Sequence, residues 1–270
     1  MEGPPPCRKA DFKKPRLRKC PFDLGTILWA KAEILGAGYD GHVWKVQFQG
    51  DEKDYVIKVF WNTGPQEWGY YAVQRECQNN AILQMIQTAV EDAKKTSHPI
   101  LVRARPVAYA GAMANLLAFS DEARQSAEKP HSADDAPADP DAMVPIEDVP
   151  RFVTCYGWLD FSGQEIRKMP KSARPRCYQD SVGTVSELSE DGEYKALVYE
   201  YIPKGPNDLE TVRATYQFLW RVGFCVSLVS HPGNWHQSVL IDMSDIVCLR
   251  SVGWSDAGYR LRSAARALGL

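Results

Sequence analysis

Several features are scarce in this 270-residue chain, and each absence excludes a class of protein. The seven cysteines are odd in number and form no CxxC pair, which argues against a disulfide framework and against a zinc ribbon. An apolar stretch as long as residues 218–230 still contains Arg221 and is too short to span a bilayer, and the N-terminal segment lacks an apolar signal core. We therefore expect a protein of a reducing compartment, nuclear or cytoplasmic, with no membrane partner.

Charge is balanced over the whole chain but not along it. The 32 Lys and Arg residues face 34 Asp and Glu residues, which gives no reason to expect a surface that coats nucleic acid. Residues 8–19, in contrast, carry seven basic side chains and one acid around Pro15. We expect residues 1–20 to form a disordered basic arm, either a solvated tail or a patch for nuclear import or an acidic partner. Direct nucleic-acid binding is expected nowhere outside this arm.

Strand-like and helix-like patterns follow the arm. Residues 34–61 alternate in character around a turn at residues 50–54, which predicts a meander of three strands, and residues 151–159 and 195–203 are typical of two more strands. Apolar side chains recur with helical spacing at Ile82, Met85, Ile86, Ala89, Val90 and Ala93. This spacing predicts one long amphipathic helix that starts before Arg75. The fold class expected is α+β.

Two segments offer little to a core. Residues 120–142 are rich in Ala, Pro, Asp and Glu and predict a disordered insertion, whereas residues 162–194 are polar and predict a long loop. Toward the C-terminus, the pattern predicts a helix at residues 211–222, an apolar hairpin-like stretch at residues 239–247 and a terminal helix.

Three glycines form the first candidate binding element. Gly36, Gly38 and Gly41 match GxGxxG, a weak signal alone because any glycine-rich hairpin can match it. A dinucleotide-binding fold needs a helix after the third glycine, but residues 42–49 continue as an alternating strand. The pattern, extended by Val43 to GxGxxGxV, therefore favours a strand-loop-strand flap over phosphates.

A lysine and a glutamate form the second element. Lys58 is the only charge in the apolar strand YVIKVFW, and a buried ammonium needs a partner. Glu76, on the first turns of the long helix, is the partner that we expect, with Glu67 as a weaker competitor. The alternatives are a lysine whose head reaches solvent and a glutamate that lies on the surface.

The glycine loop, the strand with Lys58, the Arg-Glu pair before a long helix and the segment ALVYEYIP together resemble the N-terminal lobe of protein kinases. This resemblance implies an antiparallel five-stranded N-lobe with one long helix over residues 21–202, followed by a truncated, mostly helical C-lobe over residues 203–270. It also implies that Tyr199 is the gatekeeper and that an adenine lies against the backbone of Glu200 and Ile202. The implied ligands are ATP and Mg²⁺.

Two oxygen-bearing residues resemble the metal ligands of kinases. Asn234 and Asp242 stand where the catalytic-loop asparagine and the aspartate of the DFG motif are expected, although only a short hairpin separates them. The alternatives are a turn asparagine and a helix-capping aspartate. The aspartate of the HRD motif is absent, and Leu228 or Val229 occupies its place. A hydrocarbon cannot accept a proton, so we expect the catalytic base to be missing.

The same region resembles a fungal kinetochore-subunit family that has a kinase-like fold and the pattern N[YW]..G.LVDFS. The matching residues are Asn234, Trp235, Leu240, Ile241, Asp242 and Ser244. Ser238 replaces the family's glycine and Met243 replaces its phenylalanine. This resemblance implies a nuclear, protein-binding role in a chromosome-attachment complex.

Three functions remain open, in order of preference: a nucleotide-binding pseudokinase that acts as a scaffold, an active atypical kinase, and an interaction module that no longer binds nucleotide. An active kinase needs a substitute base, for which His231 and His236 are the nearest titratable residues. The candidate nucleotide-binding residues are Gly36, Gly38, Gly41, Val43, Lys58, Glu76, Glu200 and Ile202.

Overall fold

The computed structural model describes residues 3–126, 142–226 and 231–270. Its contacts divide the chain into two compact units. The sheet unit contains Leu17–Cys77 and Val153–Ile202, and the helix unit contains the N-terminal residues up to Arg16, Gln78–Phe152 and Pro203–Leu270. Residues 78–152, which fall within the N-lobe expected over residues 21–202, pack within the helix unit.

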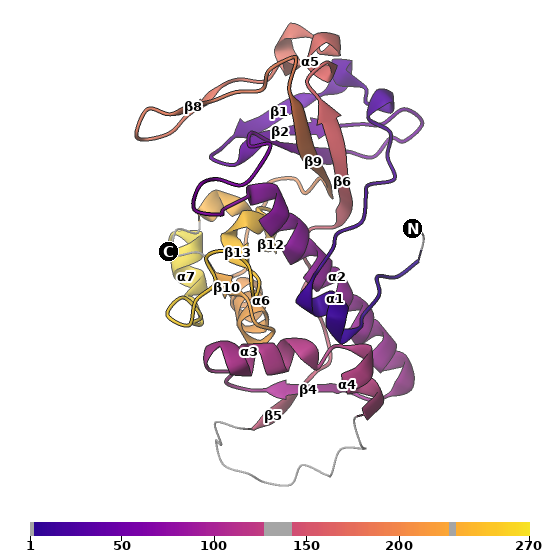
Figure 1. The fold of residues 1–270 in the computed structure, drawn as a ribbon, viewed down its shortest axis with the longest axis vertical. Coiled ribbons are helices and arrows are strands. Elements are labelled where there is room, and N and C mark those ends of the chain that lie inside the picture. Colours follow the sequence, from indigo (N-terminus) through magenta and orange to yellow (C-terminus); the bar gives the residue numbers. More distant parts are fainter. Residues whose placement is uncertain (1–2, 127–141, 227–230) are drawn as a thin grey trace. The chain divides into compact units, whose positions relative to one another are not determined.

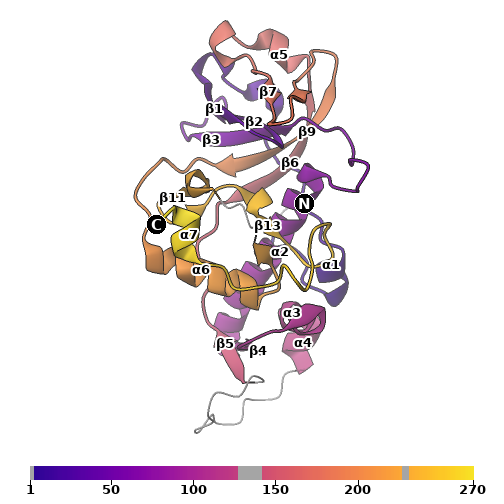
Figure 2. The same ribbon diagram turned by 90° about the vertical axis from the view of Figure 1, so that its left-hand side faces the viewer.

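The sheet unit is built on five antiparallel strands in the order β1-β2-β3-β9-β6 (Figures 1 and 2). The strands are β1 (Glu33–Ala37), β2 (Gly41–Val46), β3 (Tyr55–Phe60), β6 (Cys155–Ser162) and β9 (Glu193–Glu200). Two short 3₁₀ turns, η1 (Leu24–Thr26) and η2 (Trp29–Lys31), precede β1. The predicted strands and the α+β class are confirmed.

One face of this sheet forms a core rich in aromatic side chains. His42, Trp44 and Val46 alternate along β2 and are all buried, as the period of a strand requires. The segment between β6 and β9 covers this face, with α5 (Glu165–Lys168) over the sheet in Figure 2.

This cover is folded rather than a loop. Besides α5 it contains η3 (Lys171–Ala173) and a ribbon of β7 (Tyr178–Gln179) and β8 (Val185–Ser186). The Trp44 indole donates a hydrogen bond to the Ala173 carbonyl at 2.8 Å. The prediction of a long polar loop at residues 162–194 is therefore wrong. A few apolar side chains such as Ile166 anchor the segment to the sheet.

The long helix α2 (Ala72–Thr96) confirms the helical spacing of the sequence. All six apolar residues that predicted it are buried, and it continues from the sheet unit into the helix unit. The other helices of the helix unit are α1 (Lys9–Lys13), α3 (Ala108–Leu117), α4 (Asp121–Ser126), α6 (Leu209–Arg221) and α7 (Ala264–Leu268). No helix within the described ranges is long and apolar enough to cross a membrane.

Short strands complete the helix unit. β4 (Ile100–Arg103) pairs with β5 (Met143–Ile146), β10 (Cys225–Val226) with β13 (Ile246–Val247), and β11 (Trp235–His236) with β12 (Val239–Leu240). The 3₁₀ turns η4 (Pro232–Asn234) and η5 (Met243–Asp245) flank the β11-β12 hairpin. The described part of residues 203–270 therefore contains helices, 3₁₀ turns and short strands rather than mostly helices, and the terminal helix is confined to α7, where Ser263 caps its start.

The N-terminal arm is folded, in contrast to the expected disorder of residues 1–20. Its described part, residues 3–20, contains α1, and Phe12 is only 2% exposed. Cys7, Leu17 and Cys20 are also buried. These few apolar side chains bury the arm against the rest of the chain, although its overall composition is polar and basic. The insertion expected at residues 120–142 begins with α4, and residues 127–141 lie outside the described part of the chain.

Candidate functional site

The sheet unit brings three of the predicted nucleotide-binding residues into one row. Gly36 of β1 lies opposite Val43 of β2, and Val43 lies opposite Lys58 of β3. Directly opposed residues share a face of a sheet. Gly36, Val43 and Lys58 therefore lie on the face opposite to the one that carries Trp44.

Lys58 forms the predicted ion pair with Glu76 of α2. The distance from Nζ to Oε1 is 2.6 Å, and the two side chains are 11% and 1% exposed. The Tyr199 hydroxyl donates a hydrogen bond to the other carboxylate oxygen, Oε2, at 2.7 Å. Burial, together with the negative charge of Glu76, raises the pKa of Tyr199 well above its usual value, so the hydroxyl keeps its proton. The competitor Glu67 is exposed.

The three glycines differ in what surrounds them. A Cβ on Gly41 would lie 2.3 Å from the Val59 carbonyl oxygen, so the close approach of β2 and β3 requires glycine there. A Cβ on Gly36 or Gly38 would meet no described atom within 4 Å, and neither residue has a positive φ. The fold does not require glycine at these two positions, but a ligand that approaches the backbone closely does.

The tip of the glycine loop is held by residues that the sequence analysis missed. The Trp61 indole donates a hydrogen bond to the Gly38 carbonyl at 2.8 Å, and the Tyr70 hydroxyl donates one to Asp40 Oδ1 at 2.8 Å. Both aromatic residues belong to the connection between β3 and α2. In the sequence, this connection is rich in aromatic residues, but that composition does not predict which residues they contact.

Glu200 is fixed at the end of β9. Its backbone N–H donates to the Thr154 carbonyl at 2.9 Å, and its Oε1 accepts the Thr154 N–H at 2.7 Å. Ile202 is buried, 4% exposed. These contacts set the path of the chain beyond the sheet, and the adenine contact assigned to Glu200 and Ile202 stays a prediction.

The candidate metal ligands lie in the helix unit, at one end of the β11-β12 hairpin. The Ile241 N–H donates to the Asn234 carbonyl at 2.9 Å, which places Asn234 beside the chain that leads into Asp242. Asp242 Oδ1 accepts the Ser244 N–H at 3.1 Å and the Ser244 hydroxyl at 2.8 Å. Asp242 thus caps η5, as the alternative reading of the sequence has it, and this contact does not itself exclude a role at a metal.

The Asn234 side chain contacts Asp245 rather than Asp242. Its amide Nδ2 donates to Asp245 Oδ2 at 3.0 Å, and Asp245 is only 8% exposed. Across the described ranges, no cluster of three His, Cys, Asp or Glu side chains has the arrangement of a metal site. Any ion held here would need oxygen ligands from another source.

A buried asparagine of α2 holds the chain after Asp242. The Asn79 amide donates to the carbonyls of Met243 at 2.9 Å and Ile246 at 2.7 Å, and its Oδ1 accepts the Cys248 N–H at 3.1 Å. The amide nitrogen and the amide oxygen of Asn79 thus both bind the same segment, residues 243–248. The sequence gives no sign of this role, because an asparagine in an amphipathic helix is as readily placed on its exposed side.

The position of the missing base, Leu228 or Val229, lies outside the described residues. Of the two substitute bases considered, His231 is exposed and its Nδ1 accepts the Gly233 N–H at 3.1 Å, which caps η4. A cavity of about 500 Å³ lies elsewhere in the helix unit, lined in part by Asp92, His98 and Arg124. None of the candidate nucleotide-binding or metal residues lines it.

Comparison of the chain with models of protein families, with curated proteins and with solved structures found no match. Any functional assignment therefore depends on the residues and on their geometry.

Proposed function

We propose that this chain is a kinase-like protein that binds ATP with Mg²⁺ and acts as a pseudokinase, a scaffold for protein partners. The observation that carries the proposal is the buried Lys58–Glu76 pair on the sheet face that also carries Gly36 and Val43. In the proposed complex, Lys58 neutralises phosphate charge, Glu76 orients Lys58, and the glycine loop approaches the phosphates with its backbone N–H groups.

A purely structural role explains this arrangement less well. Removing two charges from water is costly, and well-packed hydrophobic residues often replace a buried ion pair without loss of stability. The open space around Gly36 and Gly38 is likewise not required by the fold. Both features are useful if a phosphate group approaches this face of the sheet.

Asn234 and Asp242 fit Mg²⁺ only together with a nucleotide. Amide and carboxylate oxygens are ligands that Mg²⁺ prefers, and Mg²⁺ is commonly held by one or two carboxylates plus substrate phosphates. Two side chains are too few to hold the ion by themselves. When bound, the ion would neutralise phosphate charge, and the two residues would supply its protein ligands.

The pseudokinase assignment is supported by the hydrocarbon at Leu228 or Val229. A positioned general base typically contributes about 10²- to 10⁴-fold to a rate. The His231 ring accepts the Gly233 N–H and caps a 3₁₀ turn, which is a structural role. The kinetochore-subunit resemblance extends the proposal to a scaffold in a nuclear complex, with cytoplasmic placement as the alternative.

A thermal-shift titration with ATP and Mg²⁺ tests the proposal. A ligand that binds only the folded chain stabilises it by RT ln(1 + [L]/Kd), about 2.7 kcal/mol at one hundred times Kd. We expect the shift in wild type and in Lys53→Met, where the lost lysine is exposed in the β2-β3 turn. We expect no shift in Lys58→Met/Glu76→Leu. A full shift in that double variant, or none in wild type at millimolar nucleotide, would contradict the proposal.

A further inference from the structure

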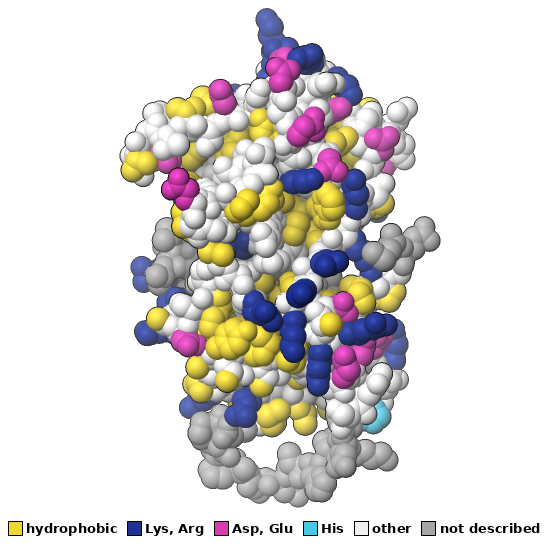
Figure 3. Space-filling model, in the orientation of Figure 1, with side chains coloured by type: hydrophobic (Ala, Val, Ile, Leu, Met, Phe, Trp, Pro, Cys, Tyr) yellow, Lys and Arg dark blue, Asp and Glu magenta, His cyan; other side chains and the backbone are white. Residues whose placement is uncertain are grey.

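The folded arm carries a dense group of cations on the helix unit. Five side chains, defined here as the basic surface, are Arg8, Lys9, Lys13, Lys14 and Arg16, and all are exposed. Figure 3 shows Lys and Arg side chains gathered over α1. The chain as a whole has a net charge of −2, so this concentration of positive charge is local.

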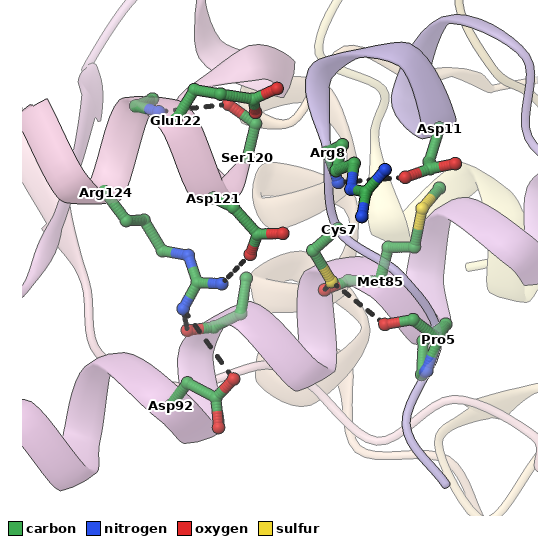
Figure 4. A network of polar contacts seen from close by, with 12 residues as sticks. Pro5, Cys7, Arg8, Asp11, Met85, Asp92, Ser120, Asp121, Glu122 and Arg124 are labelled. Carbon is green, nitrogen blue, oxygen red and sulfur yellow. Dashed lines mark hydrogen bonds and ion pairs between the residues drawn. The ribbon is translucent and has the colours of Figure 1, made fainter. Parts of the chain in front are cut away.

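The backbone that carries the basic surface is anchored to α2 and α4 (Figure 4). The Cys7 thiol donates to the Met85 carbonyl of α2 at 3.5 Å, and the Asp121 N–H of α4 donates to the Cys7 carbonyl at 2.7 Å. The Lys9 N–H donates to Glu122 Oε2 at 2.8 Å. Phe12 of α1 is buried, 2% exposed. Because this backbone is already folded, a partner does not have to order it on binding.

The charges of the basic surface are only partly offset by nearby acids, since Glu122 lies beside Arg8 and Lys9. Among the residues that the structure describes, none of the five side chains forms an ion pair. The one acid of the arm, Asp11, accepts the backbone N–H of Arg8 at 3.0 Å. Two nearby acids contact another cation, because Arg124 pairs with Asp121 at 2.7 Å and lies 3.8 Å from Asp92. A third, Glu122, has a lowered pKa because it accepts the Lys9 backbone N–H and, to a lesser extent, because the charges of Lys9 and Arg8 lie nearby.

We infer that the basic surface is a docking site for an acidic peptide segment of a protein partner. Single-stranded nucleic acid is bound with the help of exposed aromatic platforms, but the only aromatic residue of the arm, Phe12, is turned inward. Membrane attachment by an amphipathic segment needs apolar side chains that can insert, and Phe12 and Leu17 are both buried. The remaining basis for recognition is charge complementarity. A short run of Asp and Glu residues in a partner supplies the opposite charge.

Fluorescence anisotropy with a labelled oligo-glutamate peptide tests this inference. We compare two triple variants that remove the same net charge and only exposed cations. They are Lys13→Ser/Lys14→Ser/Arg16→Ser on the basic surface and Lys53→Ser/Lys171→Ser/Arg174→Ser on the sheet unit. Three exposed ion pairs of ordinary strength correspond to a roughly tenfold change in Kd. We therefore expect Kd to rise about tenfold in the first variant and to stay near the wild-type value in the second.

Two further probes identify the partner class, namely oligothymidylate of equal charge and phosphatidylserine vesicles. We expect both to bind more weakly than the peptide, and binding of the peptide to weaken with salt. The inference is overturned if the peptide does not bind at low salt, if both triple variants lose affinity equally, or if either probe binds more tightly than the peptide. ATP is left out of these measurements, so their outcome is independent of the proposed nucleotide site.

Discussion

Removal of Lys58 should destabilise the protein far more than removal of another lysine on the same sheet. Lys58→Met leaves the Glu76 carboxylate, 1% exposed, without the lysine charge that lies 2.6 Å from it. Breaking a buried ion pair in this way costs about 3–5 kcal/mol. Lys45 offers a matched control, because it pairs with Glu33 at 2.8 Å where the side chains are 23% and 61% exposed. An exposed pair contributes about 0–1 kcal/mol, so Lys45→Met should cost no more than that.

Urea unfolding followed by tryptophan fluorescence measures both changes. The double variant Lys58→Met/Glu76→Leu removes the uncompensated charge, and we expect it to recover most of the free energy of unfolding that Lys58→Met loses. Tyr199→Phe should cost less than Lys58→Met, since it removes one hydrogen bond and no charge. Equal losses in Lys58→Met and Lys45→Met would refute the argument, because they would mean that Glu76 is not buried with its partner.

Purified protein should transfer no radiolabel from ATP to itself or to a generic substrate, and transfer that disappears in Asp242→Asn would establish the atypical-kinase alternative. Burial and, to a lesser extent, Arg176 lower the pKa of His42 from 6.5 to about 4, so between these values only the unfolded chain binds the proton. Stability should therefore fall by roughly 3 kcal/mol as the pH drops from 6.5 to 4, and His42→Phe should remove this part of the pH dependence in urea titrations. Tyr70→Phe, which loses the bond to Asp40, should speed amide hydrogen exchange in the glycine loop, and unchanged exchange would show that the bond does not hold the loop.

The parts of the fold that follow from local periodicity were predictable. β2 and α2 each bury one face. The buried residues therefore recur along the sequence with the period of a strand or of a helix, and this period can be recognised without the structure. The ion pair of Lys58 was predictable for a different reason. A lone charge within an apolar strand needs a partner, and Glu76 was the acid on the next helix at a workable distance along the chain.

The folded arm and the cover of the sheet could not be predicted from composition. Phe12 anchors a segment that is otherwise almost entirely polar and basic, and Ile166 helps to do the same for the segment between β6 and β9. One or two apolar residues leave no period in the sequence. The buried face of β2 did imply that something covers it, but it did not say which part of the chain.

The hydrogen bonds that position the candidate site were also beyond the sequence. Asn79 contacts a loop more than 160 residues away along the chain, and Tyr70 reaches Asp40 across the glycine loop. Such contacts depend on tertiary geometry and involve residue types that are common on any surface. They emerge only when the elements are placed in space.

Binding of ATP is the central claim, and isothermal titration calorimetry of the purified chain with ATP and Mg²⁺ tests it most directly. We predict a saturable isotherm with one ATP per chain that is lost in Lys58→Met/Glu76→Leu. In excess Mg²⁺, Asp242→Asn should bind more weakly than wild type, and in the presence of EDTA the two should bind alike, because the carboxylate acts through the ion. A wild-type titration that stays flat at millimolar ATP would contradict the account.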